Sequence, residues 1–143
     1  KVGQSAAPLF LDRIDIQCEI SALPFKELSK AAPGEPSAKI RERVIAARAL
    51  QTARFKDVPG VHCNAQMTER MIHQYAEPDE QGLDLMRLAM ERLSLSARAY
   101  SRILKVARTI ADLAASPTVR PEHISEAITY RQLDRSDWAE RGL

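Results

Sequence analysis

The sequence predicts a mainly α-helical protein in which a helical bundle follows a single β-strand. After residue 36, apolar residues recur at helical spacing in five successive segments. Before residue 36, one short stretch alternates apolar and polar residues, which is typical of a half-buried strand. The chain has 143 residues, of which 45% are apolar and 28% are charged. This composition fits one small globular domain, or one domain with a piece of another.

The strand is predicted from Ile14 to Ile20, in the stretch LDRIDIQCEI. Its isoleucines and Cys18 alternate with acids and a glutamine, so one face of the strand would be buried. A single strand is not stable alone. Its sheet partners must therefore lie in further sequence, in another chain or in residues 1–9. The chain opens with Lys1 and reaches this strand abruptly, and we expect a fragment of a longer protein.

A linker and a domain boundary near residue 36 are predicted from residues 21–36, which contain three prolines and a glycine. The first long helix then begins with Ser37 as its N-cap and runs to about Phe55. Helical spacing indicates the side of this helix that would be buried. That side consists of Ile40, Val44, Ala47 and Leu50.

Four further helices are predicted in the rest of the chain. Thr68, Ser96 and Pro121 supply start signals, because short polar side chains cap helices and proline suits the first turn. The helices are expected from Met71 to Ala76, from residues 77–80 to Leu93, from Ser96 to about Ala115, and from Pro121 to about Tyr130. Short connections between the helices predict a compact bundle.

Composition argues against several classes of function. The net charge is only +2, with 21 basic and 19 acidic residues, so any surface for nucleic acid must be a local cluster. No apolar run reaches the roughly 18 residues that span a bilayer, and we expect a cytoplasmic protein without membrane partners. Two cysteines give no disulfide framework. The histidines and Cys63 lack zinc-ligand spacing, and no metal site is expected.

The helix SARAYSRILKVARTIADLAA carries the strongest local signal. At about 100° per residue, Arg102, Lys105 and Arg108 lie within about 80° of Arg98, so four cations share one face. That face is either solvated surface or a binding surface. Arg98 stands in the first turn, where an arginine opposes the positive end of the helix dipole unless an anion compensates. An anion is therefore a candidate partner of Arg98.

Six motifs follow one another along the chain. They are LDRIDI, IRERVIAARALQTARF, NAQMT, LSLSARAYSRILKVARTIADL, VRPEHISEAITYR and LDR. In this order they resemble the C-terminal part of the magnesium-chelatase-like AAA+ ATPases, most closely the ComM and YifB branch. The similarity extends from about Leu11 to Arg135. It implies an α/β nucleotide-binding core, an all-helical lid after it, and assembly of the subunits into a ring, usually a hexamer.

This resemblance divides the chain into three parts. Residues 1–36 would be the end of the AAA+ core, with the arginine-finger element, the last strand and the linker. Residues 37–135 would be the helical lid, the magnesium-chelatase-like C-terminal domain, and residues 136–143 a tail. The run APLFLDRID departs from the GPLLDRID typical of the family by an alanine in place of glycine and one extra residue.

The resemblance implies that Arg13 is the arginine finger, which points in trans at the γ-phosphate bound by a neighbouring subunit. A guanidinium remains charged and presents a planar fork of donors, which suits a phosphoryl group that develops negative charge. The residues alone leave another interpretation open. Arg13 could simply pair with Asp12 or Asp15 at the end of a strand.

The resemblance also implies that Arg98 is the sensor-2 arginine, which contacts the nucleotide phosphate from the start of a lid helix. Whether it serves its own or a neighbouring subunit stays open. Arg102 and Lys105 are further candidates for the same contact, and their face could instead touch the core of the adjoining subunit. ATP and Mg²⁺ are expected in the longer protein, and no cofactor in this chain.

No glycine in the sequence precedes a lysine followed by serine or threonine, so the chain contains no GxxxxGKS or GxxxxGKT phosphate-binding loop. We therefore expect no ATPase activity from this chain alone. The first hypothesis is the finger-and-lid part of a ring ATPase that remodels DNA. Its partners would be its own AAA+ core, neighbouring subunits of a homo-oligomeric ring and, through the longer protein, DNA.

The alternative is a free-standing helical module that binds DNA or a protein. It would bind DNA through the stripe formed by Arg98, Arg102, Lys105 and Arg108. Affinity of that kind falls steeply with salt, because counterions are released from the DNA.

Overall fold

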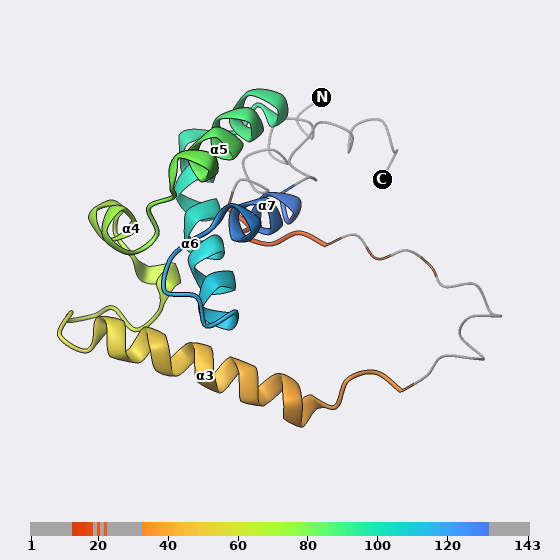
Figure 1. The fold of residues 1–143 in the computed structure, drawn as a ribbon, viewed down its shortest axis with the longest axis vertical. Coiled ribbons are helices and arrows are strands. Elements are labelled where there is room, and N and C mark those ends of the chain that lie inside the picture. The colour runs from red at the N-terminus through yellow and green to blue at the C-terminus, as the bar shows by residue number, and fades with distance from the viewer. Residues whose placement is uncertain (1–12, 19, 21, 23–32, 132–143) are drawn as a thin grey trace, which may run out of the picture.

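The structure, a computed structural model, describes residues 13–18, 20, 22 and 33–131. Within these residues the chain is mainly helical, as the sequence predicts. Each of the five predicted helices is present, with bounds close to those expected. The elements in chain order are α3 (Ser37–Phe55), the 3-10 helix η1 (Asn64–Gln66), α4 (Glu69–Tyr75), α5 (Glu80–Leu93), α6 (Ala97–Leu113) and α7 (Pro121–Thr129) (Figure 1).

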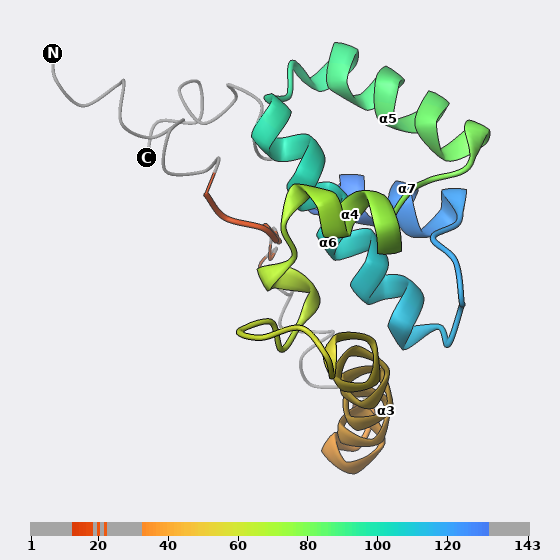
Figure 2. The same ribbon diagram turned by 90° about the vertical axis from the view of Figure 1, so that its left-hand side faces the viewer.

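Helix α6 lies at the centre of the bundle. It contacts α7, α3, η1 and α4, while α5 packs against α7. Figures 1 and 2 show α5 and α3 at opposite ends of α6. The buried apolar face of α6 has three- and four-residue spacing and consists of Ala99, Ile103, Leu104, Ala107 and Ala111. The cations Arg98, Arg102 and Lys105 therefore lie on the opposite face of a helix that the bundle holds from several sides.

Side-chain caps fix the starts of α5 and α6. Asp79 Oδ1 accepts a hydrogen bond from the amide three residues on (2.8 Å), and Ser96 Oγ accepts one from the Ala99 amide (3.2 Å). The predicted cap at Ser96 is thus confirmed. The predicted cap at Ser37 is wrong, because Pro36 occupies the N-cap position of α3 and no side chain caps that helix.

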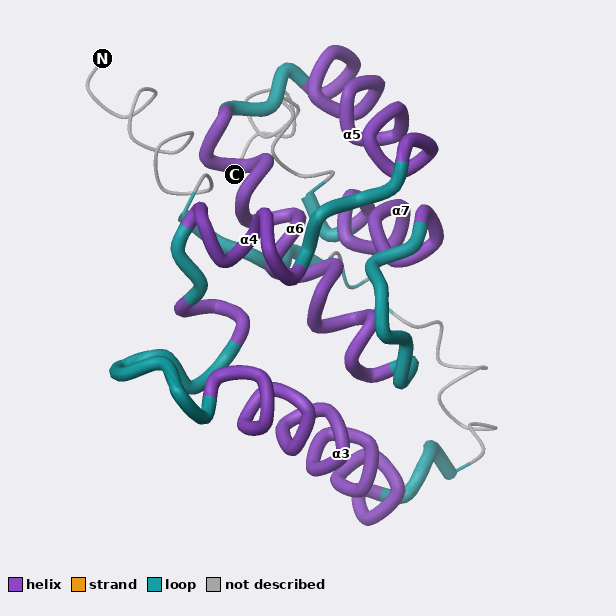
Figure 3. The backbone as a smooth tube through the Cα atoms, turned by 60° about the vertical axis from the view of Figure 1, so that its left-hand side comes forward, coloured by secondary structure: helices purple, strands orange, loops and turns teal. Residues whose placement is uncertain are grey.

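Helix α3 joins the bundle only through its C-terminal half. Its buried residues are Ala47, Gln51 and Phe55. Figure 3 shows the N-terminal half extending beyond the other helices. Of the predicted buried side, Ala47 is buried, whereas Ile40, Val44 and Leu50 are 43%, 47% and 43% exposed. Ile40 and Val44 lie in the half that the bundle does not reach, whereas Leu50 lies beside the buried row and not on it. Helical spacing thus missed both how far along α3 the bundle reaches and which side it contacts there.

No strand is present among the described residues before the first helix, which are 13–18, 20, 22 and 33–36. Residues 13–18 run past α6 and α7 (Figure 1), and the Gln17 amide donates to the carbonyl of Tyr130 (2.9 Å). A strand needs a neighbouring strand, and the described part of the chain supplies none. The predicted strand is therefore not confirmed. Residues 1–12, most of the predicted linker and the predicted tail at 136–143 lie outside the described residues.

Gly82 marks a point of close packing between α5 and α7. A Cβ at this position would lie 2.7 Å from Cδ1 of Ile124 and 2.8 Å from Cβ of Pro78. We expect Gly82→Ala to lower the free energy of unfolding by about 1 kcal/mol, because overpacking costs about 1–3 kcal/mol and alanine's higher helix propensity recovers up to about 1 kcal/mol.

Urea unfolding measures this difference. Gly34→Ala is the matched control, since an added Cβ there meets nothing within 4 Å. A Gly82→Ala variant as stable as the wild type would contradict the close packing of α5 on α7.

Candidate functional site

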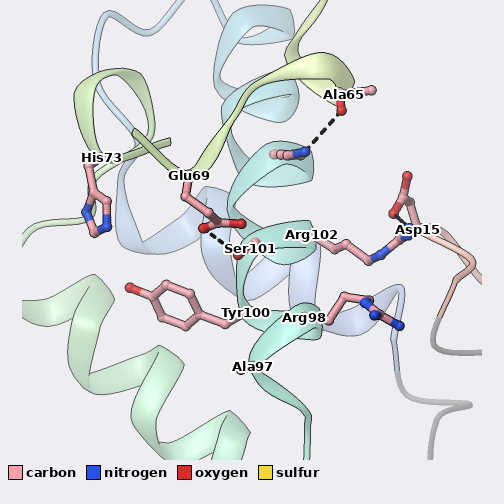
Figure 4. A pocket seen from close by; sticks show the side chains of 10 residues that line it. Asp15, Ala65, Glu69, His73, Ala97, Arg98, Tyr100, Ser101 and Arg102 are labelled. Atoms are coloured by element: carbon pink, nitrogen blue, oxygen red, sulfur yellow. Dashed lines mark hydrogen bonds and ion pairs between the residues drawn. The ribbon is translucent and has the colours of Figure 1, made fainter. Parts of the chain in front are cut away.

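Three cations of α6 line one open cleft. Arg98, Arg102 and Lys105 are spaced by four and three residues, which places them on one side of a helix. The cleft has a volume of about 730 Å³, and its other lining residues include Asp15, Ala65, Glu69, His73, Tyr100 and Ser101. In Figure 4, Arg98 and Arg102 extend toward the side of α6 on which Asp15 lies, whereas His73 and Tyr100 lie on the other side.

Arg98 lies in the first turn of α6, where the sequence predicts it, and is exposed. That turn contains no acidic residue. The unsatisfied amides and the positive dipole at a helix N-terminus favour an anion. An arginine adds a charged fork of donors that matches phosphate or carboxylate oxygens. This end of α6 is therefore suited to an anionic group.

The segment that carries Arg13 is held beside α6 and α7 by contacts to its backbone. Arg102 Nη1 donates to the carbonyl of Arg13 (2.8 Å), and the same nitrogen forms an ion pair with Asp15. Arg131, which follows α7, donates through Nη1 to the carbonyl of Ile14 (2.8 Å). Arg13 itself is exposed. The structure thus places the backbone of Arg13 against the turn of α6 that follows Arg98.

Neither Arg131 nor the pairing of Asp15 with Arg102 was expected from the sequence. The sequence offered Asp15 as a partner of Arg13, whereas the structure pairs it with Arg102. The two residues of this pair are 87 positions apart. No local spacing rule could have indicated such a contact.

Hydrogen bonds made by Lys105 and Glu69 connect α6 to η1 and to α4 along the wall of the cleft. Lys105 Nζ donates to the carbonyl of Ala65 (3.1 Å), and Ser101 Oγ donates to the carboxylate of Glu69 (2.8 Å). Burial, reinforced by the negative charge of Glu77, raises the pKa of the half-buried Tyr100 phenol above its usual value. In this structure Arg102 and Lys105 act as internal ties, which differs from the nucleotide contact that the resemblance suggests for them.

Arg108 does not belong to the exposed cationic face, and its assignment to that face is wrong. It is only 2% exposed, and its Nε and Nη2 donate to Oδ1 of Asp112 at 3.1 and 2.9 Å. It also donates to the carbonyls of Ser116 (2.7 Å) and Pro117 (3.0 Å). The side chain turns toward the carboxylate four residues on, and so the face contains three cations. The stripe of four required by the alternative DNA-binding hypothesis is not formed.

Asp112 is the centre of a buried polar cluster, which we name the Asp112 cluster. Arg54 of α3 donates to both carboxylate oxygens (2.9 and 2.5 Å), and Asn64 of η1 donates through Nδ2 (2.8 Å). Burial alone would raise the pKa of Asp112, but the donors from Arg54 and Asn64 and the charges of Arg108 and Arg54 lower it below its usual range. Sequence reasoning missed this cluster, although the spacing of Arg108 and Asp112 is that of a helical ion pair.

Among the described residues, no group of three or more histidine, cysteine, aspartate or glutamate side chains is placed to hold a metal ion. In the same part of the chain, no helix is both long enough and apolar enough to cross a bilayer. The charged groups of the cleft are arginine, lysine and carboxylate side chains from α4, α6 and the 13–18 segment.

Residues 34–131 match the family described as the C-terminal part of magnesium chelatase subunit ChlI. This range includes α3 to α7, and with them Arg98, Arg102 and Lys105. The chain belongs to this magnesium chelatase family. The resemblance to the magnesium-chelatase-like proteins is thereby confirmed.

The ComM and YifB branch of the family supplies close relatives. The chain is 39% identical over 127 residues to the uncharacterised protein YifB of Escherichia coli K12, and 36% identical over 127 residues to the competence protein ComM of Haemophilus influenzae. Each alignment covers 88% of this chain and 24% of the relative. An uncharacterised protein of Mycobacterium tuberculosis is 30% identical over 131 residues, which cover 92% of this chain and 25% of that protein. The chain spans about a quarter of the length of these curated relatives.

Proposed function

We propose that the chain supplies the arginine finger and the helical lid of a magnesium-chelatase-like AAA+ ATPase. Residues 1–36 would complete the nucleotide-binding core, residues 37–135 would form the lid, and residues 136–143 the tail. One observation supports this most. Arg102 ties the segment that carries Arg13 to the face of α6 that begins with Arg98. This contact would let the two arginines respond together to nucleotide phosphates in one ring.

Arg13 would act in trans on ATP bound by the neighbouring subunit. Its backbone carbonyl is held while the residue is exposed, which suits a side chain that reaches across an interface. The guanidinium would stabilise the negative charge that develops on the transferring phosphoryl group. Its planar fork of donors can contact two phosphate oxygens at once.

Arg98 would contact a nucleotide phosphate from the first turn of α6, as a sensor-2 arginine. The positive N-terminus of α6 adds to the attraction for phosphate. Because α6 contacts α3, η1, α4 and α7, a shift of its first turn would reach most of the bundle. Loss of the γ-phosphate could in this way change the position of the lid.

ATP and Mg²⁺ would be bound by the longer protein. The arginines of this chain fit contact with a phosphate group, but the sequence lacks the glycine-rich loop that cradles a nucleotide. The chain alone should therefore not hydrolyse ATP. Identical subunits would assemble into a ring, a hexamer by resemblance to the family, in which each interface combines a loop from one subunit with a finger from the next.

DNA is the substrate that we propose for the ring. One relative is named a competence protein, and the resemblance to its branch implies remodelling of DNA. The chain itself has a net charge of only +2, which gives little general affinity for a polyanion. Residues outside this chain would therefore make most of the contact with DNA. We also propose that the whole protein is cytoplasmic.

ATP hydrolysis by mixed rings of the full-length protein tests the proposal. Subunits with Arg13→Ala are mixed in equal amounts with subunits whose phosphate-binding-loop lysine is replaced. Each variant alone should be inactive, and the mixture should recover part of the activity, because some interfaces then join an intact loop to an intact finger. The same mixture made with Arg98→Ala shows whether Arg98 acts within its own subunit or on its neighbour's nucleotide.

Arg87→Ala is the control, since the ion pairs of Arg87 with Asp84 and Glu91 on α5 are exposed. Its mixture with the loop variant should behave like a mixture of wild type with the loop variant. If the Arg13→Ala mixture recovered no activity, action of Arg13 across the interface would be excluded.

A further inference from the structure

We propose that Arg102 and Arg131 are positioning residues that fix the Arg13 segment to the helical bundle, so that the arginine finger moves together with the lid. In the structure both residues act through residues 13–15 of their own chain. The consequence for catalysis rests on the proposed function of Arg13. The tie between the segment and the bundle is a feature of the fold and can be tested separately.

Arg102 contacts the segment at two points. Its Nη1 donates to the carbonyl of Arg13 (2.8 Å) and pairs with the carboxylate of Asp15. The side chain of Arg102 is 25% exposed and that of Asp15 is 48% exposed, and both residues line the cleft (Figure 4). A contact to a carbonyl fixes the backbone and leaves the side chain of Arg13 available to a partner.

Arg131 holds the same segment from the far end of α7. It is 1% exposed, and Nη1 donates to the carbonyl of Ile14 (2.8 Å). A buried guanidinium is costly unless it is hydrogen-bonded. Breaking this contact would therefore be unfavourable. The preceding residue, Tyr130, accepts a hydrogen bond from the amide of Gln17 (2.9 Å). The end of α7 therefore holds the segment at two further points.

These contacts attach the segment to two helices that pack against each other. Arg102 comes from α6, Arg131 and Tyr130 follow α7, and α6 and α7 are in extensive contact. The first turn of α6 carries Arg98. A shift of α6 would therefore move the backbone of Arg13 and the side chain of Arg98 together. Occupancy of one nucleotide site would in this way control the placement of the finger at the next site.

Amide hydrogen exchange in the full-length protein tests the tie directly. Arg102→Ala should accelerate exchange in residues 13–18, because the contacts to the Arg13 carbonyl and to Asp15 are lost. The charge swap that combines Arg102→Asp with Asp15→Arg should restore part of the slow exchange. Arg87→Ala, which breaks exposed ion pairs on α5, is the control and should leave exchange in this segment unchanged.

Exchange at the wild-type rate in Arg102→Ala would refute the tie. Arg131→Ala should also accelerate exchange in residues 13–18, but this residue is buried and its loss could unfold the bundle. Arg102 is partly exposed, so Arg102→Ala should still fold. That variant alone can decide the test if Arg131→Ala does not fold.

ATP turnover then separates positioning from binding. Arg102→Ala should lower kcat by roughly 10- to 100-fold, as expected when a catalytic group is misplaced by about 1 Å, and should leave KM for ATP within about twofold. The charge swap should recover part of kcat. If Arg102 instead bound nucleotide, KM would rise and the charge swap would not rescue turnover, and the positioning role would be refuted.

Two further outcomes are distinguishable. In the first, Arg102→Ala accelerates exchange in residues 13–18 but leaves kcat unchanged, while Arg13→Ala abolishes turnover. This result would refute the positioning role of Arg102 and leave the proposed function intact. Normal turnover in Arg13→Ala would instead refute the proposed function, and the exchange measurement alone would then decide whether the segment is tied to the bundle.

Discussion

Arg13→Ala in the full-length protein is expected to lower ATP turnover at saturating nucleotide by about 10³-fold or more. An arginine supplied across an interface typically contributes about 10³ to 10⁵ to the turnover of nucleotide hydrolases, because it neutralises charge that develops only in the transition state. ATP binding should change little, since the bound nucleotide is held mainly by the subunit that carries the phosphate-binding loop. Steady-state kinetics and binding of a fluorescent ATP analogue measure the two effects.

The structure makes this substitution a sharp test. The described ties of the segment use the carbonyls of Arg13 and Ile14, the carboxylate of Asp15 and the amide of Gln17. All of these groups remain when the side chain of Arg13 is shortened. A loss of turnover would therefore report the missing guanidinium rather than a displaced segment.

A conservative variant and a control variant are compared with Arg13→Ala. Arg13→Lys keeps the charge but lacks the planar fork of donors, and should recover only a small part of the lost turnover. Arg48→Ala removes an exposed arginine from α3 and should hydrolyse ATP like the wild type. Wild-type turnover in Arg13→Ala would make Arg13 an ordinary surface residue, and the alternative of a helical interaction module would take the place of the finger.

The helices could be predicted from sequence because their signals are local. Ser96 begins α6 with a side-chain cap, and the apolar residues of α6 recur at three- and four-residue spacing over the whole element. Proline at the first turn likewise marks the start of α7. Such signals depend on neighbours within one or two turns, so they can be read without knowing the rest of the fold. The Ser37 cap shows that a single local signal can still fail, since Pro36 takes the N-cap position of α3.

The strand and the buried side of α3 depend on groups far away along the chain. Alternation from Ile14 to Ile20 is typical of a strand, but strand hydrogen bonds need a second strand beside it. Ile40 and Val44 have the spacing of a buried side, yet they lie where the bundle does not reach. Periodicity states which residues could be buried, and only the tertiary structure decides which ones are.

The candidate site also has one part that local sequence signals predict and another that depends on distant residues. The place of Arg98 in the first turn of a helix follows from the sequence, since Ser96 caps that helix. Pairing of Arg102 with Asp15 does not, because it joins residues 87 positions apart. Four cations at one helical face look equivalent on a helical wheel, whereas the structure buries Arg108 and uses Arg102 to hold another segment.

Asp112→Asn is expected to lower the free energy of unfolding by about 3–5 kcal/mol, the usual effect of removing one partner from a buried ion pair. The side chain of Asp112 is fully buried and accepts hydrogen bonds from Arg54, Arg108 and Asn64. Asparagine keeps the shape but not the charge, so the guanidinium of Arg108, which is 3% exposed, and that of Arg54, which is 14% exposed, lose their common counter-charge. Urea unfolding of variant and wild type measures the difference.

Asp84→Asn is the matched control. Asp84 forms an exposed pair with Arg87 on α5, with side chains that are 64% and 61% exposed. Exposed pairs contribute about 0–1 kcal/mol, so this variant should unfold close to the wild type. Asp112→Asn within about 1 kcal/mol of the wild type would contradict this prediction, because the guanidinium groups of Arg54 and Arg108 would then tolerate the loss of their shared counter-charge.

The pH dependence of stability gives a second measure of the same cluster. Hydrogen bonds from Arg54 and Asn64 and the arginine charges outweigh burial and lower the pKa of Asp112 in the folded state. A carboxyl with a lowered pKa contributes stability above its unfolded value of about 3.9. That contribution is lost as the pH falls from about 4 through the folded pKa. The wild type should therefore lose stability more steeply than Asp112→Asn below about pH 4, and the gap between the two should narrow toward acid, because only the wild type must protonate this carboxylate.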